Sequence, residues 1–484
     1  MSAAKKQKDQ TWELTGPWAG AWKIFAGVGA LGAAGAAAGA MSDPRRFAFS
    51  WLFAFVTCLT IALGAIFFVL IQRLTSAGWS VTVRRTAEFF AYGIVALLPL
   101  FIPILLFMGH LFPWLGHGDH GAAEKHGSIS LIAPAYAQDH AAPSPTAGEK
   151  PPGTEHQPAR PSSTPEEQGS PHARPAATAV HGPIEEGGHQ TAAHAAHQAH
   201  EAAHAKIIAK KAPYLNKSFF LFRAAIYFIV WVFLAMRLFG YSTAQDTTKD
   251  PNLTLRAQAM APPATFLFAL SLTFAAFDWI MSLEPTWFST IFGVVIFACG
   301  VVSSLAVIIL TTMALRNSGP LSGAVTVEHY HDLGKLMFGF LVFWAYVQFS
   351  QLMLIWYAAL PEETTFFHNR WDHDPWQKVS MAIIIGHFVV PFFWLISRNF
   401  KRNLGRLQIG AAILLVMHVV DMYWFVMPNY MLGKEGFAFS WIDAACLLAV
   451  GGIYGAFVFY RMTQFPLIPI GDPRLQRSLH FQNA

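Results

Sequence analysis

Charged residues are scarce in this chain of 484 residues: Asp, Glu, Lys and Arg together make up 13%. A soluble domain carries about 25%, so the composition excludes an ordinary water-soluble enzyme and predicts a polytopic membrane protein. Hydrophobic residues make up 54% of the chain. The formal net charge of +5 fits loops that face anionic lipid headgroups and indicates no nucleic-acid partner.

Cysteine is nearly absent, because only Cys58, Cys299 and Cys446 occur, each inside an apolar run. Their wide spacing excludes a disulfide framework, a zinc site, an iron–sulfur run and a Cys-x-x-Cys-His haem attachment. Phosphate-binding loops, hydrolase elbows and nucleotide-binding fingerprints are also missing. We therefore expect no cofactor in this chain, and expect any covalent haem or cluster to lie on partner chains.

Long apolar runs, in contrast, are abundant. A helix needs about 20 mostly apolar residues to cross some 30 Å of hydrocarbon, and backbone satisfaction in lipid favours helices over strands. Ten runs qualify, at residues 19–41, 48–71, 89–113, 218–239, 262–283, 287–314, 333–360, 379–397, 406–427 and 441–461. The expected fold class is an all-α integral membrane protein with ten transmembrane helices.

Lys and Arg are distributed unevenly between alternate loops. One side receives most of them: Lys5, Lys6, Lys8, Arg73, Arg84, Arg85, Lys249, Arg256, Arg316, Arg398, Lys401, Arg402, Arg406, Arg461, Arg474 and Arg477. The short loops on the other side receive only Arg45, Arg46, Arg370, Lys378 and Lys434. The positive-inside rule therefore predicts that both termini are cytoplasmic. The expected organisation is residues 1–113 with the first three spans, a loop at 114–217, seven spans at 218–461 and a cytoplasmic tail at 462–484.

The first run has a second interpretation. It is rich in Gly and Ala and follows a Lys-rich start, as a cleaved signal peptide does. Its length, and small residues such as Gly35 and Gly39, favour a retained helix that packs closely on a neighbour. Cleavage would leave nine spans with the remaining topology unchanged.

Residues 114–217 have the composition of a largely disordered periplasmic loop, rich in Ala, Pro, Gly, Glu and His and poor in aromatics. Twelve of the 20 histidines lie there. Four are spaced by three or four residues on a possible Ala-rich helix: His194, His197, His200 and His204. Such spacing can bind a metal ion, but a low-complexity loop is the simpler interpretation.

Ionisable residues cluster where the seventh span begins. Four of them share one helical face at the predicted cytoplasmic surface: Glu328, His331, Asp332 and Lys335. The same face continues into the bilayer through Tyr346. An interfacial ion-pair cluster, with Asp332 and Lys335 as an i, i+3 pair, and the entrance of a proton path are both open interpretations.

Deeper ionisable groups are harder to explain, because a carboxylate at the bilayer centre costs about 2.5–3.5 kcal/mol. Asp278 lies near the periplasmic end of the fifth span and His387 near the middle of the eighth. His418 and Asp421 lie three residues apart on one face of the ninth and form the strongest candidate pair. Each could simply hold helices together, but as a set they form a ladder suited to proton transfer. His387 and His418 could also be axial ligands of a haem b. This alternative is weaker, because a two-haem cytochrome b bundle uses four histidines in two pairs and only these two lie at suitable depth.

Two stretches resemble a known family: IFFVLIQRLTSAGWSVTVRR at 66–85 and EHYHDLGKLMFGFLVFWAYVQFSQLMLIWYAALPEET at 328–364. They resemble the F subunits of bacterial alternative complex III, a quinol:cytochrome c oxidoreductase. Its two large membrane subunits are similar to the polysulfide-reductase membrane anchor family. The resemblance covers about residues 45–115 and 215–465, while the His-rich insertion departs from the compact subunit of that family.

The resemblance implies a ten-helix subunit of the bacterial inner membrane, with two four-helix bundles and two peripheral helices. Its implied partners are a sister ten-helix quinol-binding subunit, a periplasmic iron–sulfur protein, multihaem cytochromes c and lipid. Quinol would be oxidised mainly at the sister subunit, and this subunit would be a candidate path for protons. On the family pattern, the proton-path residues would be Asp278, Glu328, His331, Asp332, Lys335, His418 and Asp421.

We therefore expect a scaffolding membrane subunit without catalytic turnover of its own, whose proton path also includes Tyr346 and His387. A quinol-binding catalytic subunit is the alternative, with Asp278, Trp279 and Glu284 forming a pocket near the periplasmic face. A secondary transporter is the third hypothesis. It is disfavoured because residues 51–73 and 287–311 show only faint similarity to each other.

Overall fold

The computed structural model describes residues 12–116, 202–203, 205–372, 374–431 and 439–483. Within these ranges all regular secondary structure is helical, and ten helical segments are long and apolar enough to cross a membrane. Their bounds are Gly16–Ser42, Pro44–Leu74, Val81–Leu106, Lys217–Thr248, Pro251–Leu283, Phe292–Asn317, Val327–Ala358, Trp376–Leu395, Leu404–Met431 and Trp441–Met462. The predicted all-α fold with ten helices long and apolar enough to cross a membrane is confirmed. The histidine stripe from His194 to His204 lies outside the described residues.

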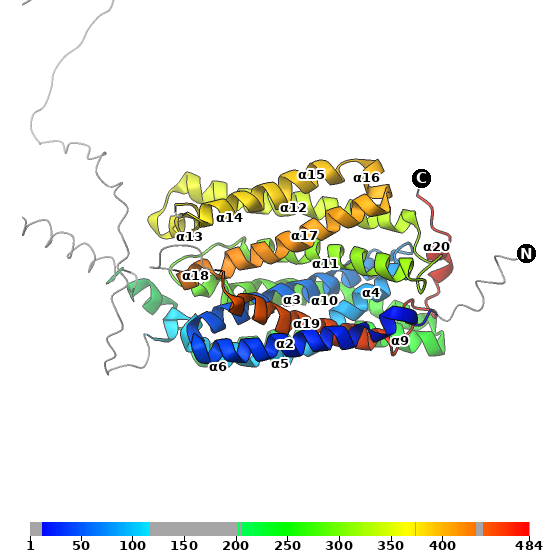
Figure 1. Cartoon of the computed structure of the whole chain (residues 1–484), viewed down its shortest axis with the longest axis horizontal. Coiled ribbons are helices and arrows are strands. Elements are labelled where there is room, and N and C mark those ends of the chain that lie inside the picture. Colours follow the sequence, from blue (N-terminus) through cyan, green and yellow to red (C-terminus); the bar gives the residue numbers. More distant parts are fainter. Residues whose placement is uncertain (1–11, 117–201, 204, 373, 432–438, 484) are drawn as a thin grey trace, which may run out of the picture. The chain divides into compact units, whose positions relative to one another are not determined.

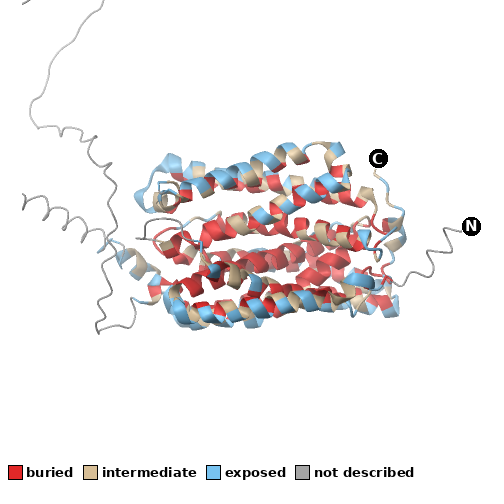
Figure 2. Cartoon of the chain, in the orientation of Figure 1, coloured by how far each residue is buried: buried red, intermediate tan, exposed pale blue. Residues whose placement is uncertain are grey.

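Two helices form the centre of the bundle (Figure 1). These are α3 (Pro44–Leu74) and α11 (Phe292–Asn317), which pack on each other and bury most of their surface. Figure 2 shows them almost wholly in the colour of buried residues, whereas α12 (Val327–Ala358), α14 (Trp376–Ile383) and α15 (Val390–Leu395) carry exposed faces. In lipid, exposing the apolar face of an outer helix carries no free-energy penalty. These helices can therefore be only partly covered by other helices.

Local sequence signals define several helix starts. Asp43 caps α3 by accepting a hydrogen bond from the Arg46 backbone N–H at 2.8 Å, and Pro44 occupies the first turn, where no N–H is needed. Ser440 and Asp443 form a reciprocal capping box at α19 (Trp441–Met462). Asp43 and Asp443 therefore act at helix termini and are not free loop charges.

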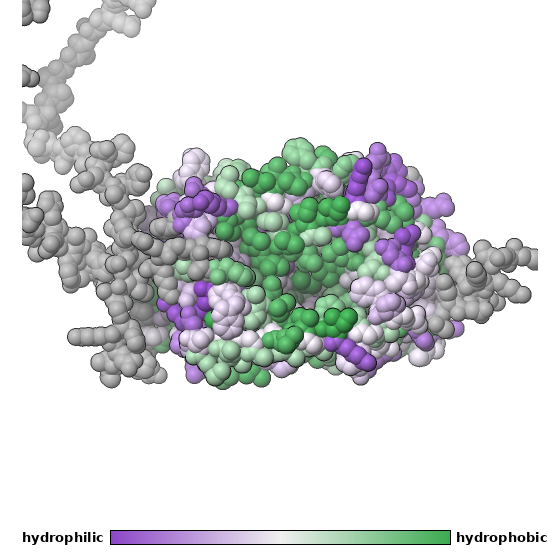
Figure 3. Space-filling model, viewed as in Figure 1, coloured by the Kyte–Doolittle hydropathy of each residue, from purple (hydrophilic) through white to green (hydrophobic). Residues whose placement is uncertain are grey.

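Apolar residues cover the middle of the bundle in Figure 3, and hydrophilic residues gather toward its two ends. Figure 1 shows the first and last described residues at the same end, as an even number of crossings requires. That end carries α20 (Leu475–Leu479), and the opposite end carries α13 (Pro361–Trp371) and α18 (Pro428–Met431). We call the first the terminal end and the second the α13 end.

Close helix contacts depend on glycine at the centre of the fold. A Cβ added to Gly64 of α3 would lie 2.1 Å from the backbone oxygen of Gly300 in α11. The first and last spans meet in the same way, because a Cβ on Gly32 of α2 (Ala21–Ser42) would lie 2.3 Å from the backbone nitrogen of Ala449 in α19. Small residues allow helix backbones in membranes to approach this closely.

We expect Gly64→Ala to destabilise the protein, because the new methyl group meets backbone that cannot move aside. Overpacking of this kind costs about 1–3 kcal/mol. Thermal unfolding in detergent measures the effect. Gly240→Ala is the matched control, since a Cβ there meets nothing within 4 Å. Equal melting temperatures for the two variants would contradict the packing interpretation.

Candidate functional site

A buried histidine–carboxylate pair lies near the middle of the eighth and ninth spans. Nδ1 of His387 is 2.7 Å from Oδ2 of Asp421 in α17 (Leu404–Val426), and the side chains are 0% and 1% exposed. Trp344 of α12 stacks on the imidazole, with ring centroids 4.0 Å apart and an interplanar angle of 16°. Groups that can exchange a proton are thus held inside the bundle, where an unpaired charge would be costly.

The backbone around His387 leaves regular helical geometry. A π-helical turn, η4 (Ile384–Val389), interrupts the eighth span between α14 and α15. Pro391 has no backbone N–H, so it cannot donate to the carbonyl of His387 four residues earlier, and the wider turn accommodates the missing bond. Gly386 lets η4 lie close to α17, because a Cβ there would be 2.8 Å from Sδ of Met417. These features bring His387 against Asp421.

Two further helices converge on the same carboxylate. Trp344 Nε1 donates a hydrogen bond to Sγ of Cys299 in α11 at 3.2 Å, and this Sγ donates to Asp421 Oδ2 at 3.7 Å. Asp421 Oδ1 and both ring nitrogens of His387 make no hydrogen bond among the described residues, although Nδ1 lies 2.7 Å from Asp421 Oδ2. The carboxylate and the imidazole can therefore receive a proton or water without breaking a hydrogen bond of the described chain.

His418 has a different partner from the one that its spacing suggests. Its Nε2 lies 3.0 Å from Oγ1 of Thr60 and 3.3 Å from the carbonyl oxygen of Thr57, both in α3. The imidazole is fully buried, and its Nδ1 has no partner within the described residues. The closest ionisable partner of Asp421 is thus His387 on a neighbouring helix, and His418 connects the ninth span to the central helix α3.

The four residues predicted at the start of α12 do lie together at the terminal end. Lys335 Nζ is 2.5 Å from Asp332 Oδ1, and Arg402 contacts both oxygens of Glu328 at 2.8 and 2.5 Å. The Asp332–Lys335 contact is the i, i+3 pair that the spacing suggests. Asn483 donates a hydrogen bond to Asp332 Oδ1 at 3.1 Å, so the segment after the last span covers this group. We call Glu328, His331, Asp332 and Lys335 the α12 cluster.

Sequence reasoning missed His329, which lies between two residues of the α12 cluster and is fully buried. Its Nδ1 accepts a hydrogen bond from the Thr326 backbone N–H at 3.1 Å, and its Nε2 lies 3.2 Å from Oγ of Ser478. His331 is 7% exposed and lies beside Asp332. Helical periodicity alone does not predict that His329 is buried, because its burial depends on how residues 463–483 pack.

Asp278 is engaged in a closed ion pair near the α13 end. Arg223 of α9 (Lys217–Thr248) donates to both of its oxygens at 2.7 and 2.8 Å, and the Tyr227 hydroxyl donates at 2.7 Å. Trp279 is 1% exposed and packs against Phe228 with centroids 5.7 Å apart. These contacts give Asp278 the geometry of a structural clamp between α9 and α10 (Pro251–Trp279).

Glu284 lies just beyond the fifth span, close to a buried arginine of α13. Its Oε2 is 3.8 Å from Nη1 of Arg370, and its Oε1 accepts a hydrogen bond from Asn369 at 3.4 Å. Arg370 also donates to the backbone oxygens of Trp424 and Phe425 at the end of α17. Burial raises the pKa of the Glu284 carboxyl above its ordinary value, although the charge of Arg370 opposes the shift. The same burial lowers the pKa of Arg370 to about 10.

A stability measurement across pH tests the burial of Glu284. A carboxyl whose folded pKa is raised contributes stability that is present below the unfolded pKa and lost as pH rises through the folded pKa. We therefore expect the stability of Glu284→Gln relative to wild type to improve as pH rises above the ordinary value of 4.5. Melting temperatures between pH 4 and 8 measure this, with the exposed Glu362→Gln as control. Parallel pH profiles for wild type and Glu284→Gln would refute it.

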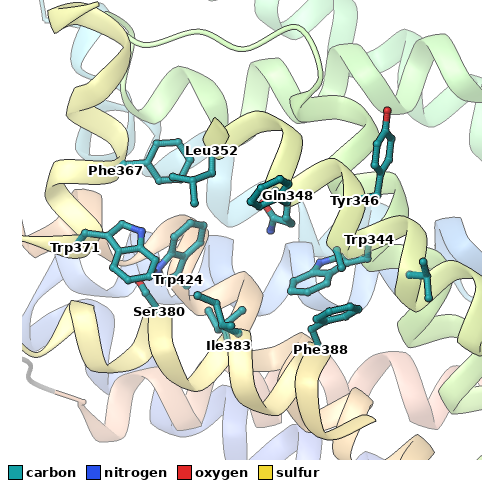
Figure 4. A pocket seen from close by; sticks show the side chains of 14 residues that line it. Trp344, Tyr346, Gln348, Leu352, Phe367, Trp371, Ser380, Ile383, Phe388 and Trp424 are labelled. Carbon is teal, nitrogen blue, oxygen red and sulfur yellow. The ribbon is translucent and has the colours of Figure 1, made fainter. Parts of the chain in front are cut away.

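Tyr346 does not reach the buried pair. Its side chain is 64% exposed, and Figure 4 shows the phenol pointing away from Trp344. The face of α12 that begins at the α12 cluster therefore points out of the bundle at Tyr346. Trp344 is the α12 residue that contacts His387.

A second buried ionic group lies at the terminal end, and its three arginines were assigned to loops in the sequence-based topology. Its members are Arg73, Arg84, Arg85, Glu88, Asp246 and Asp472, each buried. Arg84 Nη2 is 2.7 Å from Asp472 Oδ2, and Arg85 Nη2 is 2.8 Å from Asp246 Oδ2. We call this group the arginine cluster. It joins α3, α4 (Val81–Tyr92) and α9 to the segment after α19.

Within the described ranges, no three His, Cys, Asp or Glu side chains are grouped so that they could hold a metal ion. No protein-family model matches the chain. A search of curated proteins likewise finds no match.

Proposed function

We propose that this chain is a membrane subunit of a bacterial quinol:cytochrome c oxidoreductase of the alternative complex III type. In this proposal it supplies a scaffold and a proton path, while partner subunits oxidise quinol and hold haem c and iron–sulfur clusters. The observation that carries the proton path is the buried His387–Asp421 pair. The stretches at 66–85 and 328–364, which resemble the F subunits, support the choice of complex.

The proposed path has three stations. Protons enter at the α12 cluster, exchange at His387 and Asp421, and leave past Glu284, whose raised pKa suits a group that gains and loses a proton. Asp332 and Trp344 are twelve residues apart on α12, or about 18 Å at 1.5 Å per residue. Buried Met337 and Leu341 lie between them, so transfer over this interval requires water that enters between the helices.

The proposed orientation puts both termini in the cytoplasm of a bacterial inner membrane. It rests on the positive charge of the loops at the terminal end. The proposed arrangement of two four-helix bundles and two peripheral helices is supported by α2 and α19, which pack mainly on each other at the side of the bundle. The proposed partners are a sister ten-helix subunit, an iron–sulfur protein and multihaem cytochromes c.

The geometry gives less support to a quinol site at Asp278, Trp279 and Glu284. Among the described residues, Arg223 and Tyr227 donate three hydrogen bonds to the Asp278 carboxylate, and Trp279 is packed among aromatic rings. A quinol hydroxyl would have to displace a buried guanidinium from its carboxylate, which is costly.

Purification of the tagged chain from its native membrane tests the proposal. We expect it to copurify with haem c absorbance, iron–sulfur clusters and quinol:cytochrome c reductase activity. Recovery of the chain alone, without haem, in mild detergent would contradict the assignment and favour a secondary transporter. Expression in a heterologous membrane that lacks the partners is the control for adventitious cytochrome binding.

A further inference from the structure

A pocket of about 470 Å³ lies on the side of the bundle formed by α12, α13, α14, η4 and α17. It lies within the size range of small-molecule sites, about 300–1,000 Å³. Figure 4 shows side chains that surround it, among them Trp344, Tyr346, Gln348, Ser380 and Trp424. Its rim residues Tyr346 and Phe349 are 64% and 62% exposed, so the pocket opens on the outer face of α12. A ligand dissolved in the bilayer can reach it laterally.

The walls of the pocket are flat and uncharged. Seven aromatic residues contribute to them, and no Asp, Glu, Lys, Arg or His is among the lining residues. Trp344 and Trp424 come from different helices and lie on either side of the Gln348 side chain in Figure 4. Such walls suit a planar neutral ring and an apolar chain. A phospholipid headgroup would find no cation for its phosphate.

Gln348 is a polar side chain of the pocket wall that is available to a ligand. The Gln348 amide lines the pocket and makes no hydrogen bond within the described residues, although an amide can donate two and accept two. Ser380 is 2% exposed, and its hydroxyl is already engaged. It accepts from Trp424 Nε1 at 2.8 Å and donates to the carbonyl oxygen of Arg370 at 2.9 Å. Gln348 therefore offers a bound ring both donors and an acceptor, whereas Trp371 offers only its indole N–H.

We propose that this pocket binds the ring and first isoprenoid units of a membrane quinone, with a ring oxygen hydrogen-bonded to Gln348. A quinone combines a planar neutral ring, oxygen acceptors and an apolar tail, which matches each feature of the pocket. The site is separate from Asp278, Trp279 and Glu284, and it does not depend on the proton path or on the identity of the partner subunits. Trp344 forms one wall of the pocket and stacks on His387 with its ring, so the bound quinone lies one side chain away from the buried pair.

Photo-crosslinking tests the site in the purified protein, with any copurifying subunits, in lipid nanodiscs. The probe is an azido-benzoquinone with a ten-carbon tail, and the labelled peptides are identified by mass spectrometry. We expect label on residues 342–352 and 380–388 that excess unlabelled decyl-benzoquinone removes. Gln348→Leu keeps the volume and removes the amide, so it should weaken competition by about fivefold to tenfold, as loss of one neutral hydrogen bond does.

Ala345→Trp fills the pocket and should abolish the label on these peptides. Leu354→Trp is the matched control, because residue 354 lies on the same helix, is 63% exposed and does not line the pocket. Unchanged melting temperatures and gel-filtration profiles ensure that the variants are compared as folded proteins. Label that persists in Ala345→Trp, or that excess quinone does not remove, would overturn the proposal. Displacement by excess phospholipid alone would identify an acyl-chain site instead and would also overturn it.

Discussion

Asp421→Asn is expected to stop proton transfer through this subunit. The number of protons moved per electron should fall to the value that quinol oxidation alone produces, because Asn cannot take up and release a proton beside His387. General acid–base groups typically contribute about 10²–10⁴-fold to a proton-transfer step, so loss of the carboxylate should be readily measured. The assay is proton movement by the purified complex in liposomes during quinol oxidation, with the rate of cytochrome c reduction recorded in parallel.

The chain offers a matched control for this variant. His368 and Asp372 form another histidine–carboxylate contact, 2.5 Å between Nδ1 and Oδ2, but their side chains are 56% and 53% exposed. Asp372→Asn should leave proton movement unchanged, because this pair lies in water at the end of α13. Asp421→Glu should retain part of the activity. Wild-type proton movement in Asp421→Asn, with normal quinol oxidation, would rule out the buried pair as a station of the path.

Asp472→Ala is expected to cause the largest loss of stability. Asp472 accepts a hydrogen bond from Arg84 at 2.7 Å and lies 3.8 Å from Arg73, and the two arginine side chains are 0% and 1% exposed. Removing one partner of a buried ion pair leaves an uncompensated charge and costs about 3–5 kcal/mol. Thermal or denaturant unfolding in detergent measures the change. Asp374→Ala breaks an exposed pair with Lys378 instead and should cost less than about 1 kcal/mol.

The pH dependence of this loss has a defined sign. Burial by itself would raise the pKa of Asp472, but Arg84 and the Arg474 backbone N–H hold it below the ordinary value of 3.8. A carboxylate with a depressed folded pKa contributes stability above the unfolded pKa and loses it as pH falls through the folded pKa. Wild type and Asp472→Ala should therefore differ fully above about pH 4 and converge only in stronger acid. A constant difference down to pH 2 would contradict the ion-pair account.

The ten spans could be predicted because the bilayer sets the length and composition of each helix independently of its neighbours. The third span shows the limit of this reasoning. It was predicted at 89–113 but runs from Val81 to Leu106, because Arg84, Arg85 and Glu88 neutralise one another inside the bundle. Hydropathy counts these residues as loop charges, since it cannot see that their partners are adjacent.

The partner of Asp421 could not be predicted from spacing. Periodicity places His418 on the same face of one helix, but it does not report contacts between helices. His387 reaches Asp421 through the π-helical turn that precedes Pro391, and His418 instead contacts Thr60 of α3. The residue types of the site could thus be named from the sequence, whereas their pairing depends on helix packing and on one local departure from α-helical geometry.

The segment after α19 has a consequence for biogenesis. Asp472 pairs with Arg84, and Ser478 Oγ lies 3.1 Å from Thr82 Oγ1, so residues far along the chain complete the environment of α4. They leave the ribosome after all ten spans have been made. Membrane insertion and completion of the arginine cluster are therefore separate events. A chain cut shortly after the tenth span keeps Glu88 and Asp246 but lacks Asp472, so Arg84 loses its 2.7 Å partner.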